Sequence, residues 1–278
     1  MVTTAQQQTR QSGSLLTMFD ISIFFYTLAV LFCIAVALWI ASRIKNDVGI
    51  VDSFWSLMIL AAGLCFLFFS EAALTERHSI VILLLTAWAL RLAFHITWRN
   101  WGQEEDSRYQ DIRSNNQPNF EFKSLYIVFL LQAFLAVIVA LPLMSIFSSD
   151  NAMNTLDYIA ITLWLFGMFF ETVADLQLYR FKASANNQGK VLDTGLWRYS
   201  RHPNYFGELC IWWAFFLFAL ASGYWWSIIS PLLMTVLLLK VSGVSLLEST
   251  ISTRRPEYVD YCRKTNAFFP WLPKKFLG

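Results

Sequence analysis

Charged residues are scarce in this chain of 278 residues, and they make up only 14% of it. A typical soluble domain has about 25% charged residues. Hydrophobic residues make up 56%, with 25 Phe and 12 Trp, and they come in blocks of about 20, the length that spans a bilayer core. This composition excludes an ordinary soluble domain. The sequence predicts an all-α polytopic membrane protein.

Several motifs of soluble enzymes and metal proteins are also missing. The four cysteines form no CxxC pair and three of them lie in apolar runs, which argues against a disulfide framework or a zinc site. Neither a GxGxxG turn after a strand nor a GxxxxGK[ST] loop occurs, so a Rossmann domain and a P-loop are excluded. The net charge of +2 comes from basic residues scattered among loops. We therefore expect no metal and no nucleic-acid partner.

The apolar blocks predict about seven transmembrane helices, at about 20–41, 50–69, 79–98, 124–147, 156–179, 204–222 and 226–247. Of the 21 Lys and Arg residues, 17 fall in loops on one side. The positive-inside rule then places the N-terminus outside and the C-terminus in the cytoplasm. We predict a disordered tail at 1–18 and one transmembrane domain at 19–278, in a bacterial inner membrane or the endoplasmic reticulum.

Ionisable groups at membrane depth are expensive and indicate function. Arg91, His95 and Arg99 are four residues apart, so they share one face of the third predicted span. Asp52 opens the second span and is a candidate partner for them, as are the acidic residues 104–106. Two alternatives stay open: Asp52 can be a helix cap at the interface, and an intramembrane His can be a hydrogen-bonded structural residue.

A second polar group follows on the predicted cytoplasmic side. Glu171 and Asp175 are one turn apart at the end of the fifth span, and Glu208 lies one turn beyond Asn204 at the start of the sixth. Pro203 suits the first turn of a helix. Backbone N–H groups and the basic side chains of the segment 195–202 would then favour an anion at that helix start. The alternative is a basic collar that only anchors the chain at the membrane surface.

These residues stand in a pattern that resembles a known family. The stretch 195–208, Gly-Leu-Trp-Arg-Tyr-Ser-Arg-His-Pro-Asn-Tyr-Phe-Gly-Glu, looks like the signature of the membrane steroid 5α-reductase-like superfamily. Further matches run from Arg91 to Tyr109, from Glu171 to Lys182, and from Arg255 to Pro270. The chain resembles in particular the bacterial-type branch of that superfamily, known as DUF1295.

The resemblance implies seven transmembrane helices, with NADPH bound in a cytosol-facing cavity by the C-terminal half, residues 156–278. It implies reduction of an activated C=C bond in a lipophilic, steroid- or enone-like substrate taken from the bilayer. The residues that it assigns to the cofactor are Glu171, Asp175, Lys182, Arg198, Tyr199, Arg201, His202, Asn204, Glu208, Tyr261 and Arg263. Steroid reductases carry Asn where this chain has Glu171. Their catalytic Gln-Glu pair and Tyr are not matched, so Asp52 and His95 are the proposed polarising or proton-donating groups.

Two other functions remain open. Membrane methyltransferases of the isoprenylcysteine carboxyl methyltransferase type carry a similar Arg-His-Pro-x-Tyr stretch and bind S-adenosylmethionine. That ligand has no phosphate, so the basic residues Lys182, Arg198, Arg201, Arg255 and Arg263 favour NADPH. The other possibility is a non-enzymatic lipid-binding membrane protein, which would have no need for the polar groups around Asn204. The sequence does not indicate an oligomeric state.

Overall fold

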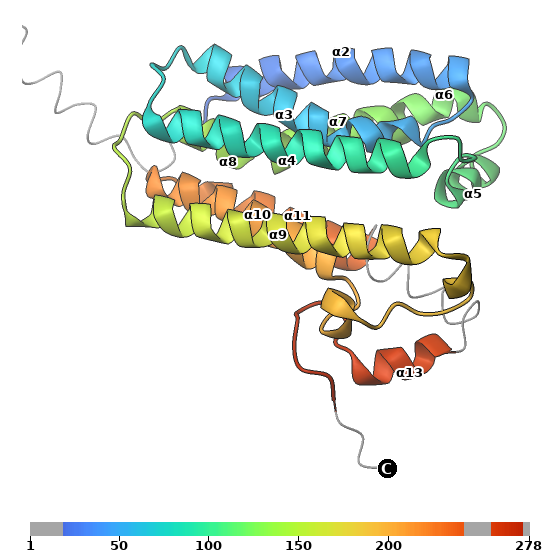
Figure 1. The fold of residues 1–278 in the computed structure, drawn as a ribbon. Helices are drawn as coiled ribbons and strands as arrows, with labels where there is room; N and C mark the ends of the chain where they lie inside the picture. Colours follow the sequence, from blue (N-terminus) through green and yellow to red (C-terminus); the bar gives the residue numbers. More distant parts are fainter. Residues whose placement is uncertain (1–18, 242–256, 275–278) are drawn as a thin grey trace, which may run out of the picture. The chain divides into compact units, whose positions relative to one another are not determined.

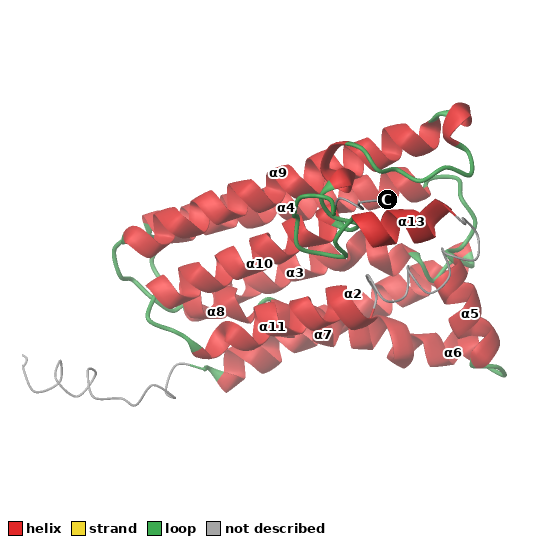
Figure 2. Ribbon diagram, turned by 90° about the horizontal axis from the view of Figure 1, so that it is seen from below, coloured by secondary structure: helices red, strands yellow, loops and turns green. Residues whose placement is uncertain are grey.

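The computed structural model describes residues 19–241 and 257–274 of the chain. All regular elements in these two ranges are helical (Figure 2). Six helices are long and apolar enough to cross a membrane, and a shorter apolar helical stretch follows at Trp226–Lys240. The predicted architecture of an all-α polytopic membrane protein is thus confirmed. The predicted tail at 1–18 and the end of the seventh span lie outside the described residues, as does Arg255.

The first compact unit comprises the chain up to Met153 together with residues 219–227. Its long helices are α2 (Ile21–Lys45), α3 (Ile50–Ser70) and α4 (Glu76–Asn100). The short α5 (Ser107–Asn115) precedes a fourth apolar stretch, built from α6 (Phe120–Ser124), the π-helix η1 (Leu125–Leu130), α7 (Leu131–Val139) and α8 (Leu141–Phe147). Helix α3 lies between its neighbours and packs on α2, α4, α7 and α8 (Figure 1).

Local sequence signals explain where these helices begin and end. Asp20 caps α2 by accepting hydrogen bonds from the N–H groups of Ser22 and Ile23, at 2.8 and 3.1 Å. Helix α2 ends at Asn46 in the left-handed conformation, a residue type that tolerates it. The fourth stretch is interrupted at Ala140, because Pro142 opens α8 and cannot continue a preceding helix.

Polar contacts fix both ends of this unit. At one end, the Arg77 guanidinium donates to the carbonyl oxygens of Asn151 and Ala152 at 2.9 and 3.0 Å, and it is 1% exposed. At the other end, the Trp39 indole donates to the carbonyl oxygen of Glu121 at 2.9 Å, and Arg43 pairs with the Glu121 carboxylate. The short loops therefore alternate between two ends, as the predicted spans require.

The second compact unit comprises residues 154–218 and 228–278. It contains α9 (Thr155–Ala183), the 3₁₀ turns η2 (Ala185–Asn187) and η3 (Gly195–Arg198), and most of α10 (Pro203–Ala221). The chain returns to this unit at the last residue of the turn η4 (Trp226–Ile228). It continues through α11 (Ile229–Val236), the π-helix η5 (Leu237–Val241) and α13 (Glu257–Lys264). Apart from residues 219–227, it corresponds to the half that the sequence assigns to the cofactor.

Helices α9 and α10 run side by side and touch through glycine (Figure 1). A Cβ atom on Gly207 would lie 2.5 Å from both the backbone nitrogen of Glu171 and the carbonyl oxygen of Gly167. A Cβ atom on Gly167 would lie 2.6 Å from the carbonyl oxygen of Gly207. Small residues allow two membrane helices to approach this closely. The contact sets which residues of α9 face α10.

Candidate functional site

The α9–α10 contact gathers acidic and amide side chains on one face. Glu171 lies one turn beyond Gly167 and sits against Gly207. One turn further, Asp175 accepts a hydrogen bond from the side-chain amide of Asn204 at 3.1 Å. The exposed fractions of Glu171 and Asp175 are 3% and 7%. The predicted grouping of Glu171, Asp175 and Asn204 is therefore present in the structure.

Two more of the predicted cofactor residues are buried on α10 and just before it. Glu208 is 5% exposed and accepts a hydrogen bond from the Trp212 indole at 2.9 Å. His202 is also 5% exposed, and its ring stacks on Tyr205 with the centroids 5.5 Å apart. Glu208, Glu171 and Asp175 are thus three carboxyl groups buried on two adjoining apolar helices. Such burial is costly and indicates a functional role.

The segment before α10 is held against α9 by polar contacts. Gly195 has a φ of +60°, and a Cβ atom there would lie 2.4 Å from the Gln177 amide nitrogen. Gln177 accepts a hydrogen bond from the N–H of Leu196 at 3.0 Å, and the Trp197 indole donates to the carbonyl oxygen of Ala174 at 3.1 Å. The positive φ favours glycine at position 195, and a larger residue would also have to displace the Gln177 side-chain amide. These contacts hold the segment 198–204 beside the C-terminal part of α9.

The C-terminal segment 257–274 makes several hydrogen bonds to residues 197–201, which precede α10. The Tyr261 hydroxyl donates to the carbonyl oxygens of Trp197 and Ser200, the latter at 3.3 Å. The Ser200 hydroxyl donates to the carbonyl oxygen of Phe268 at 2.6 Å. Burial raises the pKa of Tyr261 well above its ordinary value, and the neighbouring Tyr258 raises it further. Tyr261 therefore remains a hydroxyl donor at physiological pH.

Arg201 is part of the same set of contacts. Its Nη1 atom donates to the carbonyl oxygens of Cys262 and Thr265 at 2.9 and 3.1 Å, and its backbone N–H donates to Asn266 at 2.9 Å. The sequence predicts Arg201 as a phosphate or amide partner. The structure gives its guanidinium a role in holding the C-terminal segment, a role that spacing alone does not reveal.

The remaining predicted cofactor residues are on the surface. Lys182 and Arg198 are exposed, and Tyr199 is 38% exposed. Arg263 is exposed and pairs with Asp260 at 3.3 Å. The second unit therefore has buried acidic groups and a half-buried amide together with exposed basic groups. Within the described ranges, no cluster of three His, Cys, Asp or Glu residues could hold a metal ion.

The proposed catalytic residue Asp52 belongs to the first unit, where α5 covers the start of α3. One carboxylate oxygen accepts a hydrogen bond from the Tyr109 hydroxyl at 2.6 Å, and the other accepts one from Arg108 Nη2 at 2.9 Å. Arg108 also binds Asp106, which caps α5. Burial alone would raise the pKa of Asp106, but its hydrogen bonds with Arg108 hold that pKa below the ordinary value. Asp52 thus belongs to a partly buried ionic cluster with three residues of the α4–α6 connection.

The second proposed catalytic residue, His95, is half-buried on α4, as is Arg91. Arg99 is exposed, and its charge helps to lower the pKa of Asp106. This fits the expectation that one of the acidic residues 104–106 lies near the basic face of α4. The roles of Asp52 and His95 as catalytic groups stay predictions.

The spacing of residues does not identify Arg108 and Tyr109 as partners of Asp52. They are 56 and 57 positions away from it, and α5 is a polar helix of nine residues between two spans. The one available signal is their place in the stretch Gly102–Tyr109, which takes part in the family resemblance.

Comparison with known proteins agrees with these motifs. Residues 38–265 match the family described as "Protein of unknown function (DUF1295)". An uncharacterized protein of Schizosaccharomyces pombe is 28% identical over an alignment 273 positions long; the alignment covers 87% of this chain and 78% of that protein. No solved structure matches the chain significantly. The chain therefore belongs to the DUF1295 family of the membrane steroid 5α-reductase-like superfamily.

Proposed function

We propose that the protein is a membrane-embedded, NADPH-dependent reductase of an activated C=C bond in a lipophilic substrate. The polar face of α9 and α10 carries this proposal, because Glu171, Asp175 and Glu208 are buried there beside Asn204. Acidic and amide side chains of this kind can exchange hydrogen bonds with the ribose hydroxyls and the nicotinamide amide of a dinucleotide. Membership of the DUF1295 family supports the same function.

Basic side chains of the same unit fit the phosphates of this cofactor. Arg198 and Lys182 are exposed, and Arg198 directly precedes Tyr199 in the segment that leads to α10. Arg201 suits this task less well, because its Nη1 already donates to two backbone carbonyls. We therefore assign the 2′-phosphate to Arg198, and to Arg201 the task of holding the C-terminal segment.

When bound, NADPH supplies a hydride. The residues of α9 and α10 would hold its riboses and its amide in a fixed orientation. Such positioning of the reacting groups lowers the activation barrier. Negative charge develops on the substrate oxygen conjugated to the reacting bond, so a protein group must donate a hydrogen bond there. Asp52 and His95 are the two groups that we propose for this polarising or proton-donating role.

One observation favours a second function. Three buried carboxylates would also attract the sulfonium cation of S-adenosylmethionine. Arg201 donates to backbone carbonyls and Arg263 pairs with Asp260, so these two basic residues already have partners within the chain. A methyltransferase is therefore the second candidate. A non-enzymatic lipid-binding protein ranks below both, because it has no use for the buried carboxylates.

Ligand titration of the detergent-purified full chain distinguishes the candidates. A ligand that binds only the folded state raises its stability, by about 2.7 kcal/mol at 100 times the Kd. We expect NADPH to raise the unfolding temperature, with a smaller effect of NADH and none of S-adenosylmethionine. Stabilisation by S-adenosylmethionine alone would establish the methyltransferase, and no response to millimolar NADPH would reject the reductase.

Three variants refine the assignment. Asp175→Asn should weaken NADPH and NADH alike. Arg198→Gln should weaken NADPH more than NADH, because only NADPH carries the 2′-phosphate. Arg201→Gln should lower the unfolding temperature without any nucleotide. Lys45→Gln, at an exposed position at the end of α2, is the matched control for loss of one positive charge.

A further inference from the structure

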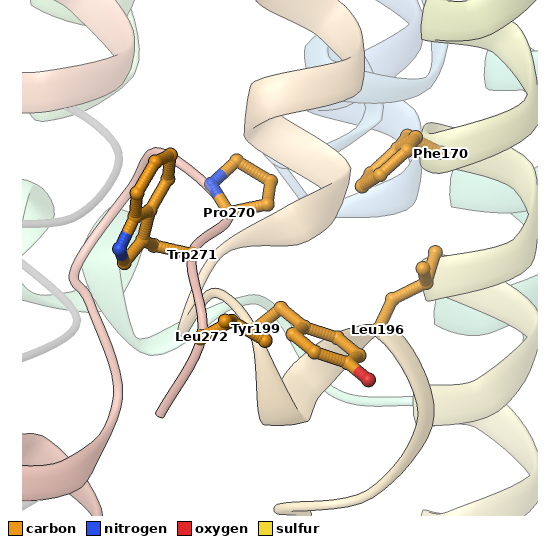
Figure 3. A pocket seen from close by; sticks show the side chains of 6 residues that line it. All are labelled: Phe170, Leu196, Tyr199, Pro270, Trp271 and Leu272. Carbon is orange, nitrogen blue, oxygen red and sulfur yellow. The ribbon is translucent and has the colours of Figure 1, made fainter. Parts of the chain in front are cut away.

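An apolar pocket of about 370 Å³ opens on the second unit, outside the buried polar face (Figure 3). Its volume lies within the roughly 300–1,000 Å³ typical of small-molecule sites. None of the six lining residues is charged. They are Phe170 of α9, Leu196 and Tyr199 at η3, and Pro270, Trp271 and Leu272 of the C-terminal segment.

The walls of this pocket are fixed to one another. The N–H of Trp271 donates to the carbonyl oxygen of Tyr199 at 3.0 Å, which joins the C-terminal wall to the η3 wall. The hydroxyl of Ser200 holds Phe268 from the other side of the same segment. A pocket with walls bonded in this way is already formed before any ligand arrives, which reduces the loss of conformational entropy on binding.

The exposure of the pocket suits a membrane surface. Trp271 and Leu272 are each 72% exposed, and the adjacent Phe269 is 63% exposed. Phe170, at the opposite wall, belongs to the 29-residue apolar helix α9. The pocket thus extends from a membrane-spanning helix to aromatic residues of the type found at the headgroup level.

Two lysines lie next to the C-terminal wall of the pocket. Lys274 follows the lining residue Leu272 by two positions, and its N–H donates to the carbonyl oxygen of Lys264 at 2.9 Å. Both lysines are exposed, and this backbone bond brings them together beside the C-terminal wall. Paired basic residues next to an apolar surface are the arrangement that attracts anionic lipid.

We propose that this pocket binds one acyl chain of an anionic phospholipid, with the lipid phosphate held by Lys264 and Lys274. The occupant is a lipid because the lining is apolar and opens beside a membrane-spanning helix. It is anionic because the exposed Lys264 and Lys274 adjoin the C-terminal wall. The buried residues Glu171, Asp175 and Glu208 do not line this pocket, whereas Tyr199, one of the predicted cofactor residues, does. The proposed lipid site does not depend on the proposed reaction.

Native mass spectrometry of the purified full chain tests the proposal, with phosphatidylglycerol and phosphatidylcholine of equal chain length as the probes. We expect one phosphatidylglycerol to remain bound at a tenfold or greater advantage in affinity over phosphatidylcholine. The double change Lys264→Gln and Lys274→Gln should lower the affinity for phosphatidylglycerol roughly tenfold and leave the affinity for phosphatidylcholine unchanged. Trp271→Ala should weaken both lipids.

Matched controls separate the site from general effects. Trp101→Ala removes an aromatic ring that is 79% exposed in the first unit, and Lys45→Gln removes one exposed charge there. Neither should change lipid binding, and all variants should keep the far-ultraviolet circular dichroism of the wild type. Equal binding of the two lipids, or unchanged binding in Trp271→Ala, would overturn the proposal. So would a dimer that disappears in Trp271→Ala, because it would assign the pocket to a second copy.

Discussion

Substitution of Gly207 by alanine is the sharpest test of the α9–α10 contact. The new Cβ atom would lie 2.5 Å from a backbone nitrogen of Glu171 and 2.5 Å from the carbonyl oxygen of Gly167. Ordinary contact begins at 3.4 Å, and backbone atoms cannot rotate away. The two helices would therefore have to separate by about 1 Å, the kind of backbone shift that overpacking forces.

Two opposing effects set the change in the free energy of unfolding that Gly207→Ala causes. Alanine favours the helix over glycine by about 1 kcal/mol. Overpacking opposes it by about 1–3 kcal/mol, and separation of the helices also removes van der Waals contacts between them. We expect a net loss of roughly 1–2 kcal/mol, since the clash is with backbone on both sides. The same shift would move Glu171 and Asp175 away from Asn204 and weaken nucleotide binding by roughly tenfold or more.

The assay is thermal unfolding in detergent, with and without NADPH. About 1 kcal/mol shifts the midpoint by roughly 2–4 °C for chains of 150–250 residues. Gly63→Ala is the matched control, because its Cβ atom would meet side-chain carbons of Leu85 and Leu143 at 2.7 and 2.9 Å. Those side chains can rotate, so its effect on stability should be smaller. Nucleotide affinity should not change in this control.

Two outcomes would refute this reasoning. If Gly207→Ala keeps the wild-type midpoint, the helices do not meet through backbone at this position. If it lowers the midpoint but leaves nucleotide affinity unchanged, the polar face of α9 and α10 is not the nucleotide site.

Two further predictions concern the cluster at α5. Tyr109→Phe removes a 2.6 Å hydrogen bond to the Asp52 carboxylate and should lower the free energy of unfolding by about 1.5–3 kcal/mol in denaturant titrations, whereas Tyr126→Phe, at an exposed position, should have no effect. Asp106 has a pKa below its ordinary value of 3.8, so its stabilising contribution is present above that pH and disappears as the pH falls through the lower folded-state pKa. Asp106→Asn should therefore be less stable than wild type at neutral pH, with a difference that shrinks below about pH 3.8; a constant difference down to pH 2 would contradict this assignment.

The positions of the helices follow closely from the sequence. The predicted spans at 50–69, 156–179 and 204–222 correspond to α3, α9 and α10 within a few residues at each end. The fourth span, predicted as one segment at 124–147, begins at Phe120 and is interrupted by a π-helix and by Pro142. Pro142 is visible in the sequence, but its effect on the span depends on how neighbouring helices accommodate the freed backbone groups.

The candidate site was only partly predictable. Glu171 and Asp175 share a face because they are four residues apart, and the link to Asn204 was inferred from the resemblance and from both helices ending on one side. The partners of Arg201 were not predictable, since carbonyl groups at Cys262 and Thr265 have no sequence signature. The apolar pocket at Tyr199 was missed for the same reason, because its walls come from three distant segments.

The sequence by itself determined the class of protein, the approximate spans and the face of each helix on which a polar residue lies. Those properties depend on composition and on the local 3.6-residue period. Only the tertiary structure decided that Gly207 meets Gly167, that Asp52 binds Tyr109 and that Arg201 holds the C-terminal segment. Local periodicity sets the direction in which a side chain points. The group that it meets depends on packing between segments far apart in the chain.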